Sequence, residues 1–433
     1  MSNGFYKNRR LKSLIFFVAC SLLTTIPHVI EIQSFSYLIF AISAVIAFYG
    51  LILISKNMKR NIFPKNIDEK ISDVNLPVLD ILVAARDEEN VIARLVERLF
   101  KLDYPAHKLN IYIIDDGSTD KTPLILERLS REFAKLKIIS RSPNAGGGKS
   151  GALNYALQFT NGEWILVLDA DAQLKKDTLT RLFNFVEEGS WSAVQLRKSV
   201  LNISKNFLTT CQSMEMAMDA IFQYGRLSVA GVSELRGNGQ LIKKEVLLEC
   251  GAFNEDTVTD DLDLSLRLLL TKSRIGILWD PPVMEEAVEN VSALFAQRQR
   301  WAEGGLQRFF DYGDQLFGHK IGYLQKFDLT YFFILQYALP IISMIDLVMS
   351  IVLFESPIFW PISLTAFILS GIAFWYGSTC KSEGPVLQNR NFLILFLSVF
   401  YLSHWFLVIP WVTIKMSIFP KKILWKKTLH TGV

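Results

Sequence analysis

Two aspartates, Asp169 and Asp171, flank a single alanine directly after the apolar run Ile165–Leu168. Two carboxylates this close repel each other unless a cation lies between them. Mg²⁺ takes oxygen ligands and usually combines one or two carboxylates with phosphate oxygens of a substrate. The motif therefore predicts that Asp169 and Asp171 hold Mg²⁺, or Mn²⁺, on a diphosphate. The alternative is a solvated turn, because Asp-x-Asp is a short pattern that arises often by chance.

A second acidic pair, Asp115 and Asp116, also follows an apolar run and is continued by a Gly-Ser-Thr-Asp sequence. One interpretation is a capped turn that opens the next helix, with Ser118 or Asp120 as the cap. The other interpretation is that one carboxylate accepts hydrogen bonds from a nucleotide base or its ribose. The sequence leaves both open.

Lys149 follows three glycines at positions 146–148 and lies at the start of a stretch with helical spacing. A flexible backbone, a helix N-terminus and a lysine together suit a phosphate group. A helix cap or a linker is the alternative. The pattern GxxxxGK[ST] does not occur, and no GxGxxG follows the first predicted strand. P-loop nucleotide hydrolases and Rossmann dinucleotide-binding proteins are therefore disfavoured.

Three acids, Asp260, Asp261 and Asp263, lie at the start of another predicted helix. Acids in the first turn interact favourably with the helix dipole, and this alone would account for them. One of them is also a candidate general base if it faces the open end of the sheet. Like-charge repulsion from Asp260 and Asp263 is expected to raise the pKa of Asp261, which suits a base.

Gln297, Arg300 and Trp301 lie in an amphipathic helical stretch near residues 292–312. Apolar residues gather near one of its faces, and the other face carries Arg298, Arg300, Glu303, Gln307 and Arg308. This pattern predicts a basic helix at a membrane interface. A second such stretch, near residues 203–229, carries three methionines, which suit either core packing or an adaptable lipid-entry surface.

Strand-like and helical stretches alternate between residues 78 and 168. This alternation predicts a mainly parallel sheet covered by helices. Ligands of such sheets bind at the carboxyl ends of the strands. The Arg86-Asp87-Glu88 cluster and the two acidic pairs each follow a predicted strand, so we expect them to meet at one edge of the sheet.

Half of the 433 residues are hydrophobic and a fifth are charged, which is less charge than an ordinary soluble domain carries. This composition excludes disorder, the four scattered cysteines exclude a disulfide scaffold, and a net charge of +4 gives no reason to expect a nucleic-acid partner. Apolar runs long enough, or nearly so, to span a membrane lie at both ends of the chain. They are Leu14–Ile30, Gln33–Ser55, Leu329–Phe354, Ile358–Ser378 and Phe392–Ile414, the third interrupted by Asp346.

Lysines and arginines precede the first run and follow the second, which predicts a hairpin over residues 1–60 with both ends inside the cell. The domain at 61–325 is then cytosolic, and residues 326–433 form a C-terminal membrane region of about three spans. Five spans would place the basic residues between 415 and 427 outside, against this rule. A re-entrant or interfacial C-terminal segment, with Pro410 as a kink, is the alternative.

Taken in chain order, five motifs resemble those of the family 2 glycosyltransferases of GT-A fold, such as cellulose, hyaluronan and chitin synthases. They are Arg86-Asp87-Glu88, Asp115-Asp116-Gly117-Ser118, Asp169-Ala170-Asp171, Thr259-Asp260-Asp261 and Gln297-x-x-Arg300-Trp301. The resemblance covers roughly residues 76–312. Within that family, residues 234–240, 258–264 and 300–308 resemble the cyanobacterial β-monoglucosyldiacylglycerol synthases. The Arg-Trp-Ala-x-Gly-Gly part also resembles poly-N-acetylglucosamine synthases.

The resemblance implies a role for each matching residue. On the donor side, it assigns Ala84, Arg86 and Glu88 to the uridine pocket, Asp115 or Asp116 to the base or ribose, Lys149 to the phosphates, and Asp169 and Asp171 to the metal–diphosphate. On the acceptor side, it assigns Asp261 as general base, and Gln297, Arg300 and Trp301 to the acceptor and the leaving diphosphate. Many members read Pro-Ala-Tyr-Asn-Glu where this chain has Ala84–Glu88, which puts the nucleoside contacts in doubt.

The implied fold is an α/β GT-A domain flanked by transmembrane helices. The implied activity is transfer of glucose, with inversion, from UDP-glucose to a diacylglycerol acceptor drawn from the lipid bilayer, in the plasma or thylakoid membrane if the source is cyanobacterial. A processive polysaccharide synthase is the alternative. It needs a channel through several spans, whereas about five spans and no additional domain favour a lipid acceptor. A non-catalytic scaffold is disfavoured because both the Asp-x-Asp motif and the candidate base are present.

Overall fold

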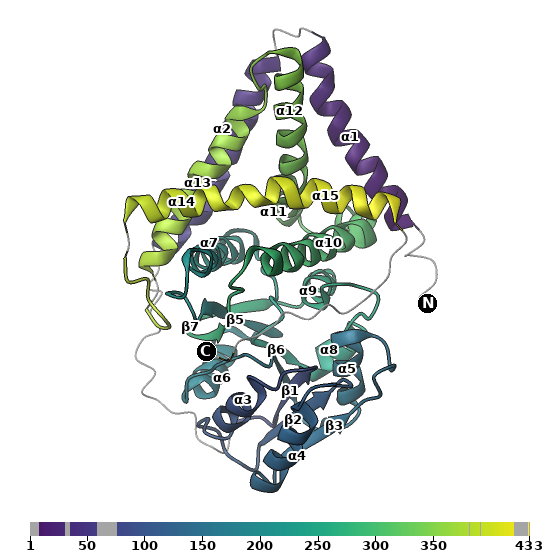
Figure 1. Cartoon of the computed structure of the whole chain (residues 1–433), viewed down its shortest axis with the longest axis vertical. Coiled ribbons are helices and arrows are strands. Elements are labelled where there is room, and N and C mark those ends of the chain that lie inside the picture. Colours follow the sequence, from purple (N-terminus) through teal and green to yellow (C-terminus); the bar gives the residue numbers. More distant parts are fainter. Residues whose placement is uncertain are drawn as a thin grey trace.

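An α/β domain lies at one end of the molecule and long helices lie at the other (Figure 1). The computed structural model describes residues 8–30, 35–58, 76–380, 382–389, 391–419 and 432. Several basic residues used to predict the orientation, at positions 7, 59, 60, 65 and 421–427, lie outside the described residues. The remaining ones, such as Arg9 and Lys56, lie within them.

A seven-stranded sheet forms the centre of the α/β domain. Its strands are β1 Leu79–Ala85, β2 Leu109–Asp115, β3 Leu136–Ser140, β4 Trp164–Leu168, β5 Ala193–Val200, β6 Gln240–Lys243 and β7 Ile275–Glu285. The order is β3-β2-β1-β4-β6-β5-β7, and only β6 runs antiparallel to its neighbours. The predicted mainly parallel sheet is thus confirmed, with one reversed strand that the sequence did not reveal.

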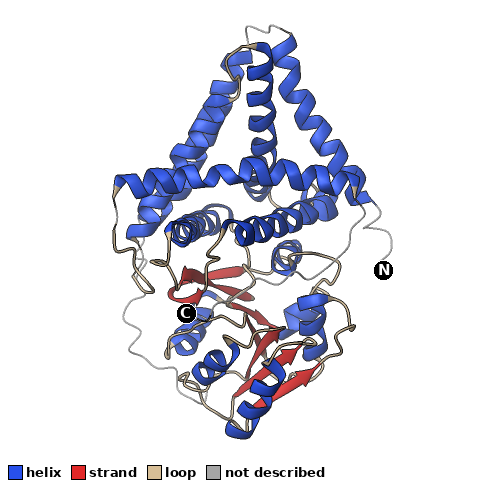
Figure 2. Cartoon of the chain, viewed as in Figure 1, coloured by secondary structure: helices blue, strands red, loops and turns tan. Residues whose placement is uncertain are grey.

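Helices cover both faces of this sheet (Figure 2). They are α3 Ile92–Leu99, α4 Thr122–Glu132, α5 Gly148–Leu157, α6 Thr178–Gly189, α8 Lys244–Glu249 and α9 Asp260–Leu270. Successive side chains of a strand point to opposite faces, so Ile81 and Val83 pack with α3, α4 and α6, whereas Leu82 and Ala84 pack with α5, α8 and α9. Burial on both faces explains why the central strands read as continuous apolar runs.

Five helical segments of the described chain are long and apolar enough to cross a membrane. They comprise α1 Arg9–Val29, α2 Phe35–Met58, α11–η2–α12 (Tyr323–Phe333, Ile334–Ala338, Leu339–Leu353), α13 Trp360–Thr379 and α14–η3–α15 (Phe392–Tyr401, Leu402–His404, Trp405–Ile418). The 21 residues of α1 extend roughly 30 Å, the thickness of a bilayer core. α1, α2, α12 and α13 rise away from the sheet and lean together at their far ends (Figure 1).

The α14–α15 segment runs crosswise to these four helices, on the side of the α/β domain (Figure 1). Its end packs on the start of α1, where the side chains of Arg10 and Ser13 donate to the carbonyls of Ser417 and Thr413 at 2.8 Å each. This segment therefore both begins and ends near the α/β domain. This course favours the interfacial alternative for one C-terminal segment.

Helices α7 (Phe207–Ala230) and α10 (Val291–Leu316) lie between the sheet and the membrane helices. A buried ion-pair network ties them to both parts. Arg226 of α7 donates to Asp328 of α11 at 2.8 Å and to Glu234 at 2.9 Å, and Tyr49 of α2 donates to Asp328 at 2.9 Å. The network therefore fixes the membrane hairpin to the loop that leads into β6.

Glu234 is the centre of this network, because Arg226, Arg236 and Arg308 all contact its carboxylate, at 2.9, 2.7 and 3.2 Å. Burial opposes its charge, but these arginines hold the pKa of Glu234 well below its ordinary value. The resulting stabilisation is present above the carboxyl's ordinary pKa and is lost as the pH falls through the depressed one.

We expect Glu234→Gln to lower the free energy of unfolding by about 3–5 kcal/mol, because it leaves buried guanidinium charge without its counter-ion. The measurement is thermal unfolding of the detergent-purified protein at neutral pH. The matched control is Glu127→Gln. The ion pair of Glu127 with Arg131 is exposed and should contribute less than about 1 kcal/mol to the free energy of unfolding. Equal melting temperatures for the two variants would contradict the assigned role of Glu234.

Candidate active site

A cavity of about 1500 Å³ lies between the carboxyl edge of the sheet and helices α7, α10 and α15. Most of the residues predicted to carry chemistry line it, namely Ala84, Glu88, Lys149, Asp169, Asp171, Asp261, Gln297, Arg300 and Trp301. They come from five separate parts of the chain. The sheet gathers the residues that follow β1 and β4, and α5, α9 and α10 bring the others to the same edge.

Lys149 is held against the first aspartate of the Asp-x-Asp motif. It lies in the first turn of α5, and its Nζ is 2.5 Å from Asp169 Oδ1. Burial acts against the charge of Lys149, but Asp169 and Asp260 raise its pKa above the ordinary value. Lys149 is therefore a cation at neutral pH, at the N-terminal end of a helix, where both charge and dipole favour phosphate.

The Asp-x-Asp motif fits a divalent metal that is shared with a ligand. Asp171 is 4% exposed, and its Oδ2 accepts from the backbone N–H of Glu286 at 2.9 Å. Asp169 is more exposed and lines the same cavity. No group of three or more His, Cys, Asp or Glu side chains arranged for a metal occurs among the described residues. Two carboxylates are the number that Mg²⁺ often takes from a protein when substrate phosphates supply further oxygen ligands.

The candidate base lies at the start of α9. Asp260 and Asp261 both line the cavity. Asp261 comes close to Gly237, whose φ is +80°, and a Cβ at Gly237 would lie 3.2 Å from Asp261 Oδ2. The loop before β6 therefore approaches this carboxylate at a residue that has neither a side chain nor a strain penalty for positive φ.

The pKa of Asp261 is raised chiefly by burial, and that of Asp260 is raised by burial to about 6. The predicted contribution of Asp263 is wrong, because Asp263 is paired with Arg267 at 2.7 Å and accepts from Tyr312 at 3.0 Å. These contacts place Asp263 among the helices beside the cavity. Repulsion between Asp260 and Asp261 adds to burial only as a smaller cause.

We expect activity to rise with pH across the range in which Asp261 loses its proton, since a base must be deprotonated to accept a proton. This range should lie above that of an ordinary aspartate, because burial raises the pKa of Asp261. The measurement is the pH dependence of kcat/KM for the donor, which reports groups of the free enzyme. Asp260→Asn removes one of the two repelling charges, so the acidic limb should move to lower pH. An acidic limb that stays in place in this variant would contradict the coupling of the two aspartates.

The polar face of α10 is largely buried, whereas the sequence indicates only a basic helix at a membrane interface. Arg298 is 1% exposed and contacts Glu215 of α7, while it donates to Tyr401 of α14 at 3.2 Å. Its guanidinium also lies 4.0 Å from the ring centre of Trp301. The physical reason is that α7 and α14 cover this side of the helix and supply an anion and a phenol for the charge.

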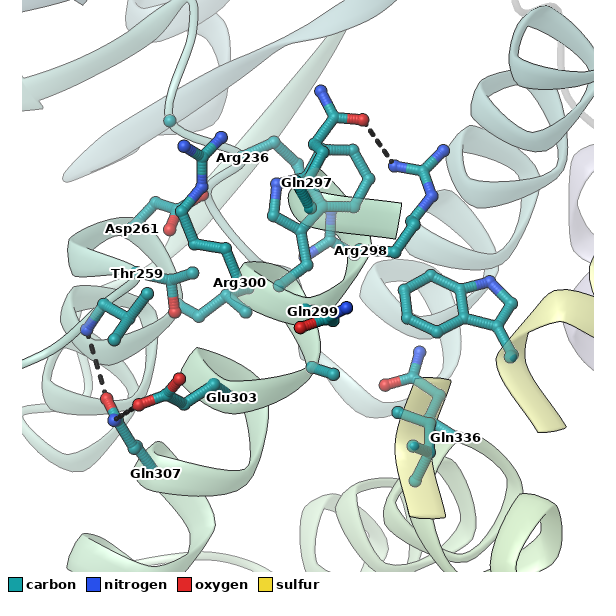
Figure 3. A pocket seen from close by; sticks show the side chains of 18 of the residues that line it. Arg236, Thr259, Asp261, Gln297, Arg298, Gln299, Arg300, Glu303, Gln307 and Gln336 are labelled. Atoms are coloured by element: carbon teal, nitrogen blue, oxygen red, sulfur yellow. Dashed lines mark hydrogen bonds between the residues drawn. The ribbon is translucent and has the colours of Figure 1, made fainter. Parts of the chain in front are cut away.

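Figure 3 shows Asp261, Arg236, Gln297 and Arg300 projecting toward one region of the cavity. Burial lowers the pKa of Arg300, whereas Asp169 and Asp261 act against this decrease. Gln297 accepts from Arg298 at 3.1 Å. The buried Arg298 therefore orients the amide of Gln297, the first residue of the Gln-x-x-Arg-Trp motif. The arrangement places a cation and an amide opposite the acidic residues.

The side chains of Arg86, Asp115 and Asp116 do not line this cavity. Asp116 is 2.5 Å from Arg141, and Asp115 accepts from the backbone N–H of Ser118 at 3.0 Å. The turn interpretation is also supported, because Asp120 accepts from the backbone N–H of Thr122 at 2.9 Å. Arg86, Asp115 and Asp116 lie at the end of the sheet beyond Lys149, and their assignment to the nucleoside stays a prediction.

Two residues of the cavity wall were missed from the sequence. Arg236 donates to both Asp219 and Glu234, at 2.8–3.0 Å and 2.7 Å, and it lowers the pKa of Asp261 against the larger effect of burial. Glu215 accepts from Trp405 of α15 at 3.2 Å. Arg236 lies within the stretch that carried the family resemblance, so that motif was the available signal. Glu215 had none.

Comparisons with known proteins agree with this geometry. The family model "Glycosyltransferase like family 2" matches residues 77–304. The β-monoglucosyldiacylglycerol synthase of Nostoc sp. is 41% identical over 85% of this chain and 80% of its own length. That of Synechocystis sp. is 39% identical over 91% of this chain and 83% of its own.

The solved structure of the mannosyltransferase PcManGT from Pyrobaculum calidifontis, in complex with GDP-Man and Mn²⁺, shares the fold. It superposes with a TM-score of 0.60 at 19% identity, over 88% of this chain and 98% of that one. The family match, the two relatives and the sheet with its flanking membrane helices lead to one conclusion. The chain belongs to the family 2 glycosyltransferases of GT-A fold, in the membrane group that includes the β-monoglucosyldiacylglycerol synthases.

Proposed function

We propose that the chain transfers glucose from UDP-glucose to the free hydroxyl of 1,2-diacylglycerol and forms β-monoglucosyldiacylglycerol. One observation carries the proposal: a single cavity joins the carboxylates and Lys149 at the sheet edge to apolar side chains of η2, α13 and α15. A polar donor and an apolar acceptor thus have access to the same site. The two relatives that are about 40% identical over most of their length support glucose as the sugar and diacylglycerol as the acceptor.

The proposed step is a single displacement. The acceptor oxygen attacks the anomeric carbon of glucose, the bond from that carbon to the UDP oxygen breaks, and Asp261 takes the hydroxyl proton. Inversion of an α-linked donor gives a β-product. Lys149 and Arg300 face the charge that grows on the departing diphosphate, and fixed charges of this kind are often the largest catalytic contribution.

A divalent ion between Asp169 and Asp171, when bound, would neutralise part of that diphosphate charge. Hydrogen bonds within the chain hold Asp169 and Asp171 in place. Asn238 accepts from the backbone N–H of Asp169 at 3.1 Å, and Glu286 fixes Asp171 through its backbone N–H at 2.9 Å. The carboxylates are therefore positioned before any ligand arrives, which lowers the entropy cost of binding.

We also propose that the α/β domain lies in the cytosol. Arg9, Arg10 and Lys12 at the start of α1 and Lys56 near the end of α2 lie on the same side of the membrane helices as this domain. Lysines and arginines near span ends concentrate on the cytoplasmic side. The crosswise course of α15 keeps Lys415 on that side too, which removes the conflict that five spans would create.

The decisive test offers the purified protein UDP-glucose, UDP-galactose and UDP-N-acetylglucosamine, each with diacylglycerol in mixed micelles and a divalent cation. We expect one glucose on diacylglycerol, identified by mass spectrometry and by its β-anomeric NMR coupling. Polymer that grows without diacylglycerol would instead support the polysaccharide synthase alternative and refute the proposal.

A further inference from the structure

Two uncharged stripes of membrane helices line one side of the cavity. On α13 the stripe is Ser363, Ala366, Phe367 and Ser370, and on η3–α15 it is Leu402, Trp405, Phe406 and Ile409. Both have the i, i+3, i+4, i+7 spacing of one helix face. Each face is therefore turned toward the cavity along two turns, and the rings of Phe367 and Phe406 meet where the stripes approach, with 5.6 Å between their centroids. We call the part of the cavity that the two stripes line the acceptor arm.

A glutamine lies at the polar end of this arm. Gln336 belongs to η2, a π-helical turn between α11 and α12, where the backbone N–H of Leu339 donates to the carbonyl of Ile334 five residues earlier. Pro340 has no N–H to offer the carbonyl of Gln336, and single π turns of this kind occur often at functional sites. The side chain of Gln336 is exposed and lines the cavity.

A second glutamine, Gln299 of α10, lines the same cavity. Figure 3 labels both Gln299 and Gln336 among the residues of the cavity wall. Two primary amides offer both donors and acceptors at the border between the uncharged stripes and the catalytic carboxylates. An amide left without a partner among apolar side chains costs free energy, so these positions favour a ligand with hydrogen-bonding groups of its own.

The charge of the acceptor arm narrows the class of ligand. None of its eight stripe residues, nor Gln299 or Gln336, is charged. Glu215, which accepts from Trp405 in the α15 stripe, is already paired with Arg298. A lipid phosphate would need a cation in its binding site. The stripes and the two glutamines offer only amides and hydroxyls, and Arg298, which lines the same cavity, is paired with Glu215. The uncharged lining of the stripes therefore favours a neutral lipid over a lipid phosphate.

We propose that the acceptor arm holds the acyl chains of a neutral two-chain glycerolipid, and that Gln336 and Gln299 bind its ester carbonyls so that the free hydroxyl reaches Asp261. This inference rests on the proposed function and adds its acceptor-binding residues. Gln336 is a specificity-determining residue in this arrangement, because its amide recognises the ester groups and takes no part in the chemical step.

The first test is Gln336→Leu, which keeps the approximate volume and removes the amide. Loss of a neutral hydrogen bond should raise the KM for diacylglycerol, measured as mole fraction in micelles, about three- to tenfold. UDP binding and the KM for UDP-glucose should stay unchanged. The matched control is Gln388→Leu, an exposed residue of the loop before α14 that does not line the cavity. Equal acceptor KM values for the two variants would overturn the proposal.

The second test fills the arm and detects the lipid directly. Ala366→Phe adds a ring to the α13 stripe, and Leu364→Phe adds it to an exposed position of the same helix. A diacylglycerol with a photoreactive acyl chain should label peptides of α13 and α15 in the wild type and in Leu364→Phe, and label them far less in Ala366→Phe. Labelling of other helices alone, or equal labelling in all three proteins, would overturn the acceptor arm.

These outcomes separate this inference from the proposed function. If the wild type forms no glucosyl-diacylglycerol, the proposed function is wrong. If the wild type forms it and the two Gln→Leu variants behave alike, the function holds and the acceptor arm is wrong.

Discussion

Replacing Asp261 by asparagine is expected to abolish sugar transfer while nucleotide binding survives. The change keeps the size of the side chain and removes its basicity, and loss of a general base typically costs about a hundred- to ten-thousand-fold in rate. UDP should bind with nearly wild-type affinity, because the proposed contact of Asp261 is with the acceptor hydroxyl. The measurements are the initial rate of glucosyl-diacylglycerol formation and UDP affinity by calorimetry.

Two neighbouring aspartates serve as controls for this experiment. Asp263→Asn should keep most of the activity, because Asp263 pairs with Arg267 beside the cavity, although it will lower stability. Asp260→Asn should be milder than Asp261→Asn. If instead Asp261→Asn retains more than about a tenth of the rate, less than the loss expected for a base, the role moves to Asp260, which lines the same cavity.

Metal removal is expected to have the second large effect. EDTA should stop transfer, and added Mg²⁺ or Mn²⁺ should restore it, because the Asp-x-Asp carboxylates need a cation to bind a diphosphate. Asp171→Asn should lose nearly all activity and weaken UDP binding only when the metal is present. Metal-dependent UDP affinity is therefore a readout that does not require turnover.

The matched control for this variant is Asp103→Asn, since the Asp103 side chain is half exposed and pairs with Lys176 at the surface. It should behave like the wild type in every assay. Full activity of the wild-type protein in excess chelator would disprove the metal–diphosphate site. The unfolding temperature of Asp171→Asn, measured alongside, checks that lost activity does not reflect lost fold.

Most of the fold could be predicted from local patterns. The strands around Val83 and Val167 were predicted because burial on both faces makes them continuously apolar. The short strand β6 was not, because its four residues are too few for a periodic pattern and its direction is set by its neighbours. The cluster at 86–88 and the two acidic pairs were predicted to meet, since the carboxyl ends of parallel strands share one edge. Glu88, Asp169 and Asp171 do line one cavity there, whereas Asp115 and Asp116 do not.

The partners of buried charges could not be predicted in the same way. Arg298 and Glu215 are 83 residues apart and meet only because α7 packs beside α10. Asp346 interrupted an apolar run for no visible reason. It accepts from the backbone N–H groups of Ile358 and Phe359 at 2.9 Å each, and lies 2.8 Å from His28 Nε2. It therefore satisfies the start of α13, a contact that exists only after the helices assemble.

The crosswise helix α14–α15 has a consequence for membrane asymmetry. This helix lines the acceptor arm and lies on the side of the α/β domain, so the proposed acceptor would reach Asp261 from the leaflet that faces this domain. The sugar would then stay in that leaflet, since a glucose headgroup crosses the hydrocarbon core slowly. Under the proposed function the bilayer would gain its glycolipid from one face, and a glucolipid in the opposite leaflet would require a separate protein that moves it across.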